Sequence, residues 1–402
     1  MAKKLISGLY STEFYRLLEG ALLARGYASL EDWLAENPNY WFDEEAWKSL
    51  YTLAPFENPA RTFDQKIGER SVPIMATYLS DEAEGPLLPT DGVSQKTGEI
   101  PRMGRGVAFD IAAYEKMQML ARQGIDVQDA YYDQFVKDTM NLIQSIHSQR
   151  SFTGFQVESK GSYLTTKETS SGGIIGFEIN LNPIAENRKK CGGFWLGEYK
   201  HGTKVAWGTA GSKPIGDLED MYNFGWRMRI IPRDPSKSVF RMSASNWELM
   251  KANADTRARV ALWKYGPKSA DDLAAYEYVS EEDLENYLKS LKIPNVEVES
   301  YYGFGTVINP KTKKFETVET EAFDPNTVVL RPAGNFGEFQ WKRATNILAT
   351  ADSPIMYTDG GAMAICEDRG KKGLVFQIES ICLPVPKAIQ TVLYLSTNEA
   401  AS

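Results

Sequence analysis

The segment over residues 62–108 most constrains what this chain can fold into. Its second half, GPLLPTDGVSQKTGEIPRMGRG, is rich in glycine and proline and has few large apolar residues. It shows neither a helical nor a strand period, so it has no evident means of burying itself. Loops of this length inside a compact domain are usually functional or disordered. The segment therefore predicts an extended arm.

Composition limits the class of protein. With 402 residues the chain has room for two or three domains, and 43% hydrophobic and 24% charged residues are ordinary globular values. The net charge is −8, so no basic face for nucleic acid is expected. No run approaches the roughly 18 apolar residues that cross a bilayer. Three cysteines are too few for a disulfide framework or a zinc site, although a Cys366–Cys382 bridge stays open.

Helical periods are clearest in five places. Residues 1–61 read as short helices with Trp33 and Trp47 on their faces, which we expect to dock on something larger. The strongest period predicts a long helix over about 126–149. A capped helix is expected from Ser245 to Gly266, a shorter one starts at Pro214, and another follows Ser280.

Strand patterns occupy much of the rest. They cover 154–166, 172–181, 191–208, 227–232, 238–243 and 295–303, and three further runs between 362 and 396. The limb 100–110 is expected to pair with 71–80 in a long, loose hairpin. The α/β portion between two β portions indicates that the flanking parts form one discontinuous domain.

No residue pattern points to catalysis, a cofactor or a metal. His147 lies near the end of the apolar face of the long helix, which predicts a packing or capping role, and His201 is expected in a solvated turn. The acidic run Glu281 to Asp283 suits the first turn of a helix. "GFGT" at 303–306 and "GRG" at 104–106 lack a strand-to-helix context and read as turns.

Several passages, taken in order, carry a resemblance to a known family. They are "KIGERSVPIMATYLSDEAEGPLLPTDGVSQKTGEIPRMGRG", "AYYDQFVKDTMNLIQSIHSQRSFTG", "VAWGTAGSKPIGDLEDM", "VFRMSASNWELMKANADTRARV", "IPNVEVESYYG", "DPNTVVLRPAG" and "LVFQIESICLPVPKAIQTVLYL". In this order the chain resembles the major capsid proteins of tailed bacteriophages, of the Hong Kong ninety-seven-type fold and its lambda-like branch.

The resemblance implies an α+β fold with five parts. They are an N-terminal arm (1–61), an extended loop (62–108), a peripheral domain with a spine helix (109–207), an axial domain (208–345) and a second peripheral part (346–402). Only about 60 residues precede the loop, so we expect no large cleaved scaffold segment.

The resemblance also implies a function, with no enzymatic activity. The subunit would self-assemble into hexamers and pentamers of an icosahedral head enclosing double-stranded DNA, without sequence-specific binding. Its expected partners are identical subunits, scaffolding protein, portal and a decoration protein, with no membrane, in a virion assembled in the host cytoplasm. The expected contacts between subunits come from the arm and the loop: Trp33, Trp47, Val72, Ile74, Met75, Tyr78, Leu79, Leu87, Leu88 and Lys96. Lys96 also lies where some family members form a covalent cross-link, although a solvated lysine explains it equally simply.

Three alternatives remain open at this point. An encapsulin-type nanocompartment shell has the same fold and encloses protein cargo. A carboxylate-dependent hydrolytic enzyme would need a deep pocket with paired carboxylates, which leave no short sequence signature. A tail or baseplate protein would assemble into rings or tubes.

Overall fold

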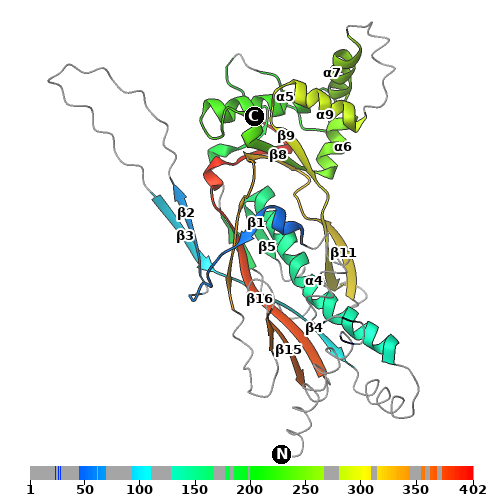
Figure 1. Cartoon of the computed structure of the whole chain (residues 1–402). Coiled ribbons are helices and arrows are strands. Elements are labelled where there is room, and N and C mark those ends of the chain that lie inside the picture. The colour runs from blue at the N-terminus through cyan, green and yellow to red at the C-terminus, as the bar shows by residue number, and fades with distance from the viewer. Residues whose placement is uncertain are drawn as a thin grey trace, which may run out of the picture. The chain divides into compact units, whose positions relative to one another are not determined.

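The computed structural model divides the chain into two compact units, each described here by itself (Figure 1). The first contains residues 1–63, 97–151 and 338–385, and the second contains 64–96, 152–337 and 386–402. The structure describes residues 23, 26, 28, 45–60, 62–68, 93–109, 128–165, 177–181, 185–197, 200–266, 280–308, 315–343, 355–357, 363–368 and 374–401. The limb expected over 71–80, and residues 110–124, for which the sequence predicts a helix, lie outside these ranges.

The first unit is built on one sheet with the strand order β1-β13-β16-β15-β14, and β4 also pairs with β16. Its strands are β1 (Tyr51–Leu53), β4 (Arg102–Phe109), β13 (Gly337–Lys342), β14 (Ile355–Tyr357), β15 (Met363–Asp368) and β16 (Leu374–Pro386), with the short helix η2 (Ala46–Ser49) before β1. The hairpin expected around residues 369–373 is confirmed by the antiparallel pairing of Asp368 with Leu374.

The second unit holds a five-stranded sheet with the order β7-β17-β12-β8-β9. Its strands are β7 (Arg188–Cys191), β8 (Ser238–Ser243), β9 (Asn295–Glu299), β12 (Thr327–Pro332) and β17 (Leu393–Ala400), and its helices are α5 (Pro214–Arg227), α6 (Ala244–Ala252), α7 (Ala254–Tyr265) and α9 (Glu281–Ser290). Figure 1 shows these helices gathered beside β8 and β9. The last strand, β17, thus shares a sheet with residues that the sequence assigned to another domain, and the five-part division stays a prediction.

The remaining elements are one long helix, three two-stranded pairs and three short 3-10 helices. They are α4 (Gln128–Lys160), the pairs β2 (Thr62–Gly68) with β3 (Val93–Glu99), β5 (Ser162–Thr165) with β6 (Phe177–Asn180) and β10 (Tyr302–Ile308) with β11 (Phe315–Glu321), and η3 (Ala185–Asn187), η4 (Pro235–Lys237) and η7 (Ile389–Thr391). The predicted mixture of helices and sheets is confirmed.

The core of the second unit follows from the alternation of its strands. Phe240 and Met242 of β8, and Val328 and Leu330 of β12, are fully buried in one apolar cluster with side chains of α5, α6, α7 and α9. Successive side chains of a strand point to opposite faces of the sheet. The other face of the same strands must therefore bury Arg241 and Arg331.

These two arginines hold a buried carboxylate at the end of α4. Arg331 Nε donates to Glu158 Oε1 at 2.7 Å, and Arg241 Nε lies 3.3 Å from the same oxygen. Glu158 is fully buried. Arg241 also contacts Glu297 and Glu299 of β9 at 3.0 and 2.9 Å. Burial lowers the pKa of Arg241, but the attraction of its three glutamates outweighs this and the net shift is upward.

The long helix extends further than its periodicity predicts. It runs to Lys160, eleven residues beyond the predicted end at 149, and takes in residues 154–160 that read as a strand. Almost every residue from 151 to 159 is buried, whichever way it points from the helix axis. A helix covered on all sides has no amphipathic period, so the pattern of "GFQVES" resembled a buried strand.

The predicted helix from Ser245 to Gly266 is two helices. Ser243, and not Ser245, is the N-cap of α6, since its Oγ accepts from the backbone N of Asn246. The chain breaks at Asn253, whose side chain accepts from the N–H groups of Asp255 and Thr256 and so caps α7. The predicted end at Gly266 is confirmed, with a φ of 75°. The helix start predicted at Pro214 and the N-cap predicted at Ser280 are also confirmed.

Several strand and turn predictions were wrong. Residues 192–197, 200–208 and 228–232 form turns and irregular chain, whereas "GRG" lies within β4 and "GFGT" within β10. The limb 100–110 was expected to pair with 71–80, but β4 pairs with β16 of the first sheet along its whole length. The limb that belongs to the arm is instead β3, which pairs with β2.

We predict that Arg331→Met lowers the free energy of unfolding by about 3–5 kcal/mol, because it leaves Glu158 buried with half of its partners. Chemical denaturation of the unassembled chain measures this. Lys190→Met is the matched control, since Lys190 pairs with Glu399 while both are about half exposed (54% and 51%), and its loss should cost at most about 1 kcal/mol. Equal small effects of both substitutions would contradict the role of the buried pair.

Candidate functional site

Most of the residues expected at subunit contacts lie outside the described part of the chain. This holds for Trp33 and for the loop residues Val72, Ile74, Met75, Tyr78, Leu79, Leu87 and Leu88. Lys96 lies in β3, where the backbone is described and the side chain is not. Their roles stay predictions.

The two limbs that lead into and out of the loop are paired as a hairpin. Figure 1 shows β2 and β3 side by side. Gly98 in β3 faces Phe63 of β2 so closely that a Cβ at residue 98 would lie 2.5 Å from the ring. This contact requires glycine, and it explains one of the glycines that made the segment read as structureless.

Trp47 does not fit the contact role predicted for it. Only 2% of its surface is exposed, because the ring packs within the first unit against Phe339, with the centroids 5.1 Å apart. Its backbone N donates to Ser151 Oγ at 3.1 Å. A side chain that its own subunit already covers has no surface left for a neighbour, so the prediction for Trp47 was wrong.

His147 packs on the same indole, as predicted. Trp47 Nε1 donates to His147 Nδ1 at 3.2 Å, and the two rings are stacked. Burial, with the nearby charges of Arg150 and Lys48, lowers the pKa of His147 to about 3. The imidazole is therefore neutral at pH 7, and its approach to Glu45 at 3.9 Å is not an ion pair.

Two carboxylates of α5 hold the irregular segment before that helix. Asp217 accepts from Trp207 Nε1 at 3.0 Å, and Asp220 accepts from the backbone N–H groups of His201 and Gly202. A Cβ at Gly202 would lie 2.0 Å from Asp217 Oδ1. The side chain of His201 is exposed, as predicted. These acids are occupied in fixing a loop, so they do not form a free acid–base pair.

Burial shifts the pKa of both acids upward. For Asp217 the loss of water raises the pKa to about 7, although the hydrogen bond from Trp207 opposes the shift. For Asp220 burial again raises the pKa, against the N–H donors of Gly202 and His201.

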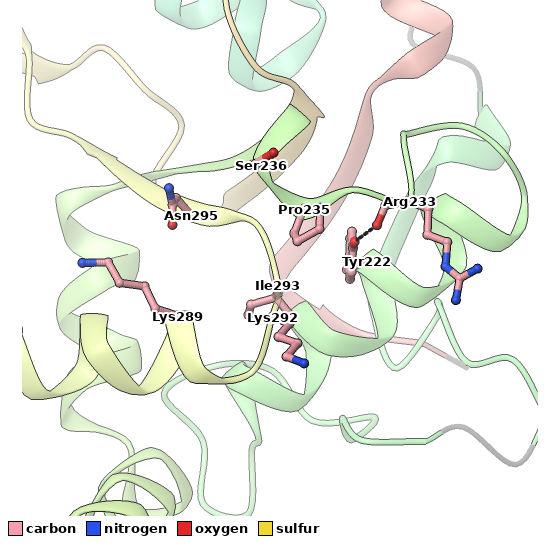
Figure 2. Close-up of a pocket in the computed structure, with 8 residues that line it drawn as sticks. All are labelled: Tyr222, Arg233, Pro235, Ser236, Lys289, Lys292, Ile293 and Asn295. Atoms are coloured by element: carbon pink, nitrogen blue, oxygen red, sulfur yellow. Dashed lines mark hydrogen bonds between the residues drawn. The ribbon is translucent and has the colours of Figure 1, made fainter.

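A hollow of about 470 Å³ lies between α5, η4, α9 and β9. Its lining is Tyr222, Arg233, Pro235, Ser236, Lys289, Lys292, Ile293 and Asn295. Figure 2 shows Tyr222, Pro235 and Ile293 at its centre, with the charged ends of Arg233, Lys289 and Lys292 directed outward. Tyr222 donates to the carbonyl of Arg233 at 2.5 Å. No carboxylate lines this hollow, so it is not the site that a carboxylate-dependent hydrolase requires.

The β10–β11 hairpin carries an exposed aromatic face. Phe304 is 65% exposed and Tyr302 38%. In the antiparallel register they stand opposite Glu319 and Glu321. On the other face of the hairpin Gly303 lies against Phe152, since a Cβ at this residue would lie 2.5 Å from the ring, whereas Val318 on that face is 42% exposed. This face therefore combines an exposed aromatic centre with acidic residues beside it.

Metal-ligand clusters and membrane-spanning helices are both absent from the described residues. No group of three or more metal-ligating side chains occurs there, and no described helix is long and apolar enough to cross a membrane.

Comparison with known proteins gives similarities to solved structures alone. No family model and no curated protein sequence matches the chain. The match to the capsid of cyanophage P-SCSP1u covers 87% of this chain and 86% of the cyanophage chain, with 10% identity and a TM-score of 0.41. The mature capsid of bacteriophage PhiM1 covers 87% and 86%, with 7% identity and a TM-score of 0.38. A phage-related protein from Bordetella bronchiseptica RB50 covers 89% and 92%, with 10% identity and a TM-score of 0.41.

The chain is similar to phage capsid proteins of known structure. This is the family that its motifs resemble.

Sequence reasoning missed the two surfaces described here. The aromatic face was hidden in "YYGFGT", which read as a turn, although alternating glycine and aromatic residues also fit a strand with one bare face. The hollow joins residues 222, 233–236 and 289–295, and no local pattern brings these together.

We predict that the free energy of unfolding of Asp217→Asn, relative to the native chain, rises between about pH 4 and 7. In that range the folded carboxyl keeps a proton that the unfolded one releases, so raising the pH destabilises the native chain and not the variant. The gain is up to about 4 kcal/mol for a shift of roughly three pKa units. Denaturation at a series of pH values measures it.

Asp234→Asn is the control. Asp234 accepts from Ser236, which lowers its pKa, so this variant should lose stability relative to the native chain as the pH rises. A pH-independent difference for Asp217→Asn would show that Asp217 is ionised throughout.

Proposed function

We propose that this chain is the subunit of a phage capsid shell. It assembles into hexamers and pentamers of an icosahedral head that encloses double-stranded DNA, in a virion assembled in the host cytoplasm. Scaffolding protein, portal and a decoration protein are its partners besides identical copies. Within this proposal, the axial, peripheral and arm regions keep the boundaries that the resemblance implies.

The observation that supports the proposal is the agreement, in order, between the resembling passages and the elements they form. The spine passage forms the 33-residue helix α4. "PIGDLEDM" opens α5, and "VFRMSASNWELM" forms a strand followed by a Ser-capped helix. The later passages form β9, β12, β16 and β17. In these passages the strands and helices follow the order that the resemblance implies.

The arm has a described base that fits a role in tying neighbours together. The paired β2 and β3 form that base, and the residues between them are those expected to contact a neighbour. An extended limb with unpaired backbone groups can add to the sheet of another subunit. Val72, Ile74, Met75, Tyr78 and Leu79 would supply the side chains of this contact.

The test is to delete the part of the arm beyond its base. Replacing residues 72–90 with a short Gly-Ser linker keeps β2, β3 and β4, whereas a larger deletion reaching residue 105 would also remove the start of β4 from its pairing with β16. We expect the native chain to form closed shells by negative-stain microscopy and sedimentation. The deleted chain should stay as folded, unassembled subunits.

Shells that form equally well without residues 72–90 would contradict the role of the arm. A native chain that is monomeric under every condition would contradict the shell itself. Packaged protein in place of DNA would favour the nanocompartment shell, and open tubes would favour a tail protein.

A further inference from the structure

We propose that Phe304 of one copy inserts into the basic hollow of a neighbouring copy. The basic hollow is the depression lined by Tyr222, Pro235 and Ile293 and edged by Arg233, Lys289 and Lys292. This inference rests on the proposed function, and it identifies the contact by which copies join.

The first support is that Phe304, a large apolar side chain, is exposed to water. Its ring is 65% exposed within its own chain, on a hairpin whose other face is held against Phe152. Burying an aromatic side chain removes roughly 150–250 Å² from water. The hairpin thus presents one large apolar side chain outward on a fixed base.

The second support is the shape and polarity of the hollow. Its volume of about 470 Å³ lies within the range of sites that hold small ligands, so a single phenyl ring fits. Tyr222 and Ile293 are almost fully buried beneath it and provide an apolar floor. A ring inserted there would lose its water without displacing a charged group.

The third support is charge complementarity. β10 and β11 carry three glutamates and no basic residue, and Glu319 stands directly opposite Phe304. The hollow is edged by three cations. Of the nearest acids, Glu285 lies 3.7 Å from Lys289, and Asp234 accepts hydrogen bonds from Ser236. The same chain thus carries an acidic hairpin and a basic hollow, which favours a second copy as the occupant. The contact would have an aromatic centre and a charged rim.

Because the two surfaces are different patches of one unit, each copy can offer Phe304 to one neighbour and its basic hollow to another, in a head-to-tail contact. Head-to-tail contacts build rings when their rotation closes and filaments when it does not. This contact therefore suits the closed capsomers of the proposed function.

The experiment compares substitutions in the full-length chain by sedimentation velocity and negative-stain microscopy over a range of concentrations. Phe304→Ala should raise the concentration needed for assembly by about 10-fold or more, as for a central interface residue. Val318→Ala is the matched control, because Val318 is 42% exposed on the opposite face of the same hairpin. It should leave assembly unchanged.

Charge reversal provides the second test. Glu319→Lys and Lys292→Glu should each impair assembly, and the double variant should recover most of it. Circular dichroism checks that each variant is folded. If Phe304→Ala does not fold, the recovery in the double variant decides alone.

The outcomes separate this contact from the shell. Assembly that is unaffected by Phe304→Ala and by both reversals overturns the contact and leaves the shell standing. Small rings that depend on Phe304 but never close into shells support the contact and overturn the shell. A native chain that stays monomeric at every concentration overturns both.

Discussion

The buried carboxylate of Glu158 is the constraint on which the second unit depends. A charge without water is costly unless it is paired and hydrogen-bonded, and here the pairing comes from Arg331 and Arg241 on the adjacent strands β12 and β8. Since Arg241 stands opposite Val329 and Arg331 opposite Val239, both arginines share one face. The sheet must therefore present a charged face to α4 and an apolar face to the helices α5, α6, α7 and α9.

This two-faced sheet explains which parts of the fold the sequence could predict. Helices α5 and α9 have a clear start, at Pro214 and at the N-cap Ser280, and an apolar face that the sequence period reports. The last turns of α4 have no solvent side, and β8 is buried at every position. Residues 192–208 depend on Asp217 and Asp220, which follow them in the chain. The spacing of hydrophobic residues cannot predict the structure of a segment that is held by hydrogen bonds from residues elsewhere in the chain.

Aromatic residues show the same limit at the candidate site. Trp47 and Phe304 are both large apolar residues in short elements, and the sequence suggested a contact role for the first and a turn for the second. The structure reverses this, because Phe339 and His147 cover Trp47 while glycines 303 and 305 set Phe304 on the bare face of a strand. Whether an aromatic side chain serves the core or a partner depends on what lies opposite it, and that is decided by distant segments.

Because every copy has a net charge of −8, the proposed contact between copies depends on the local arrangement of charged residues and not on the overall charge. Whole subunits of like charge repel one another, but at physiological ionic strength this repulsion is screened beyond about 8 Å. Within that distance Glu319 would meet the cations of the hollow and not the average charge of the chain. Salt would therefore act in two directions, weakening the general repulsion and the specific attraction together. An aromatic knob such as Phe304 provides binding that salt does not screen, so a contact of this kind can persist where charge alone would fail.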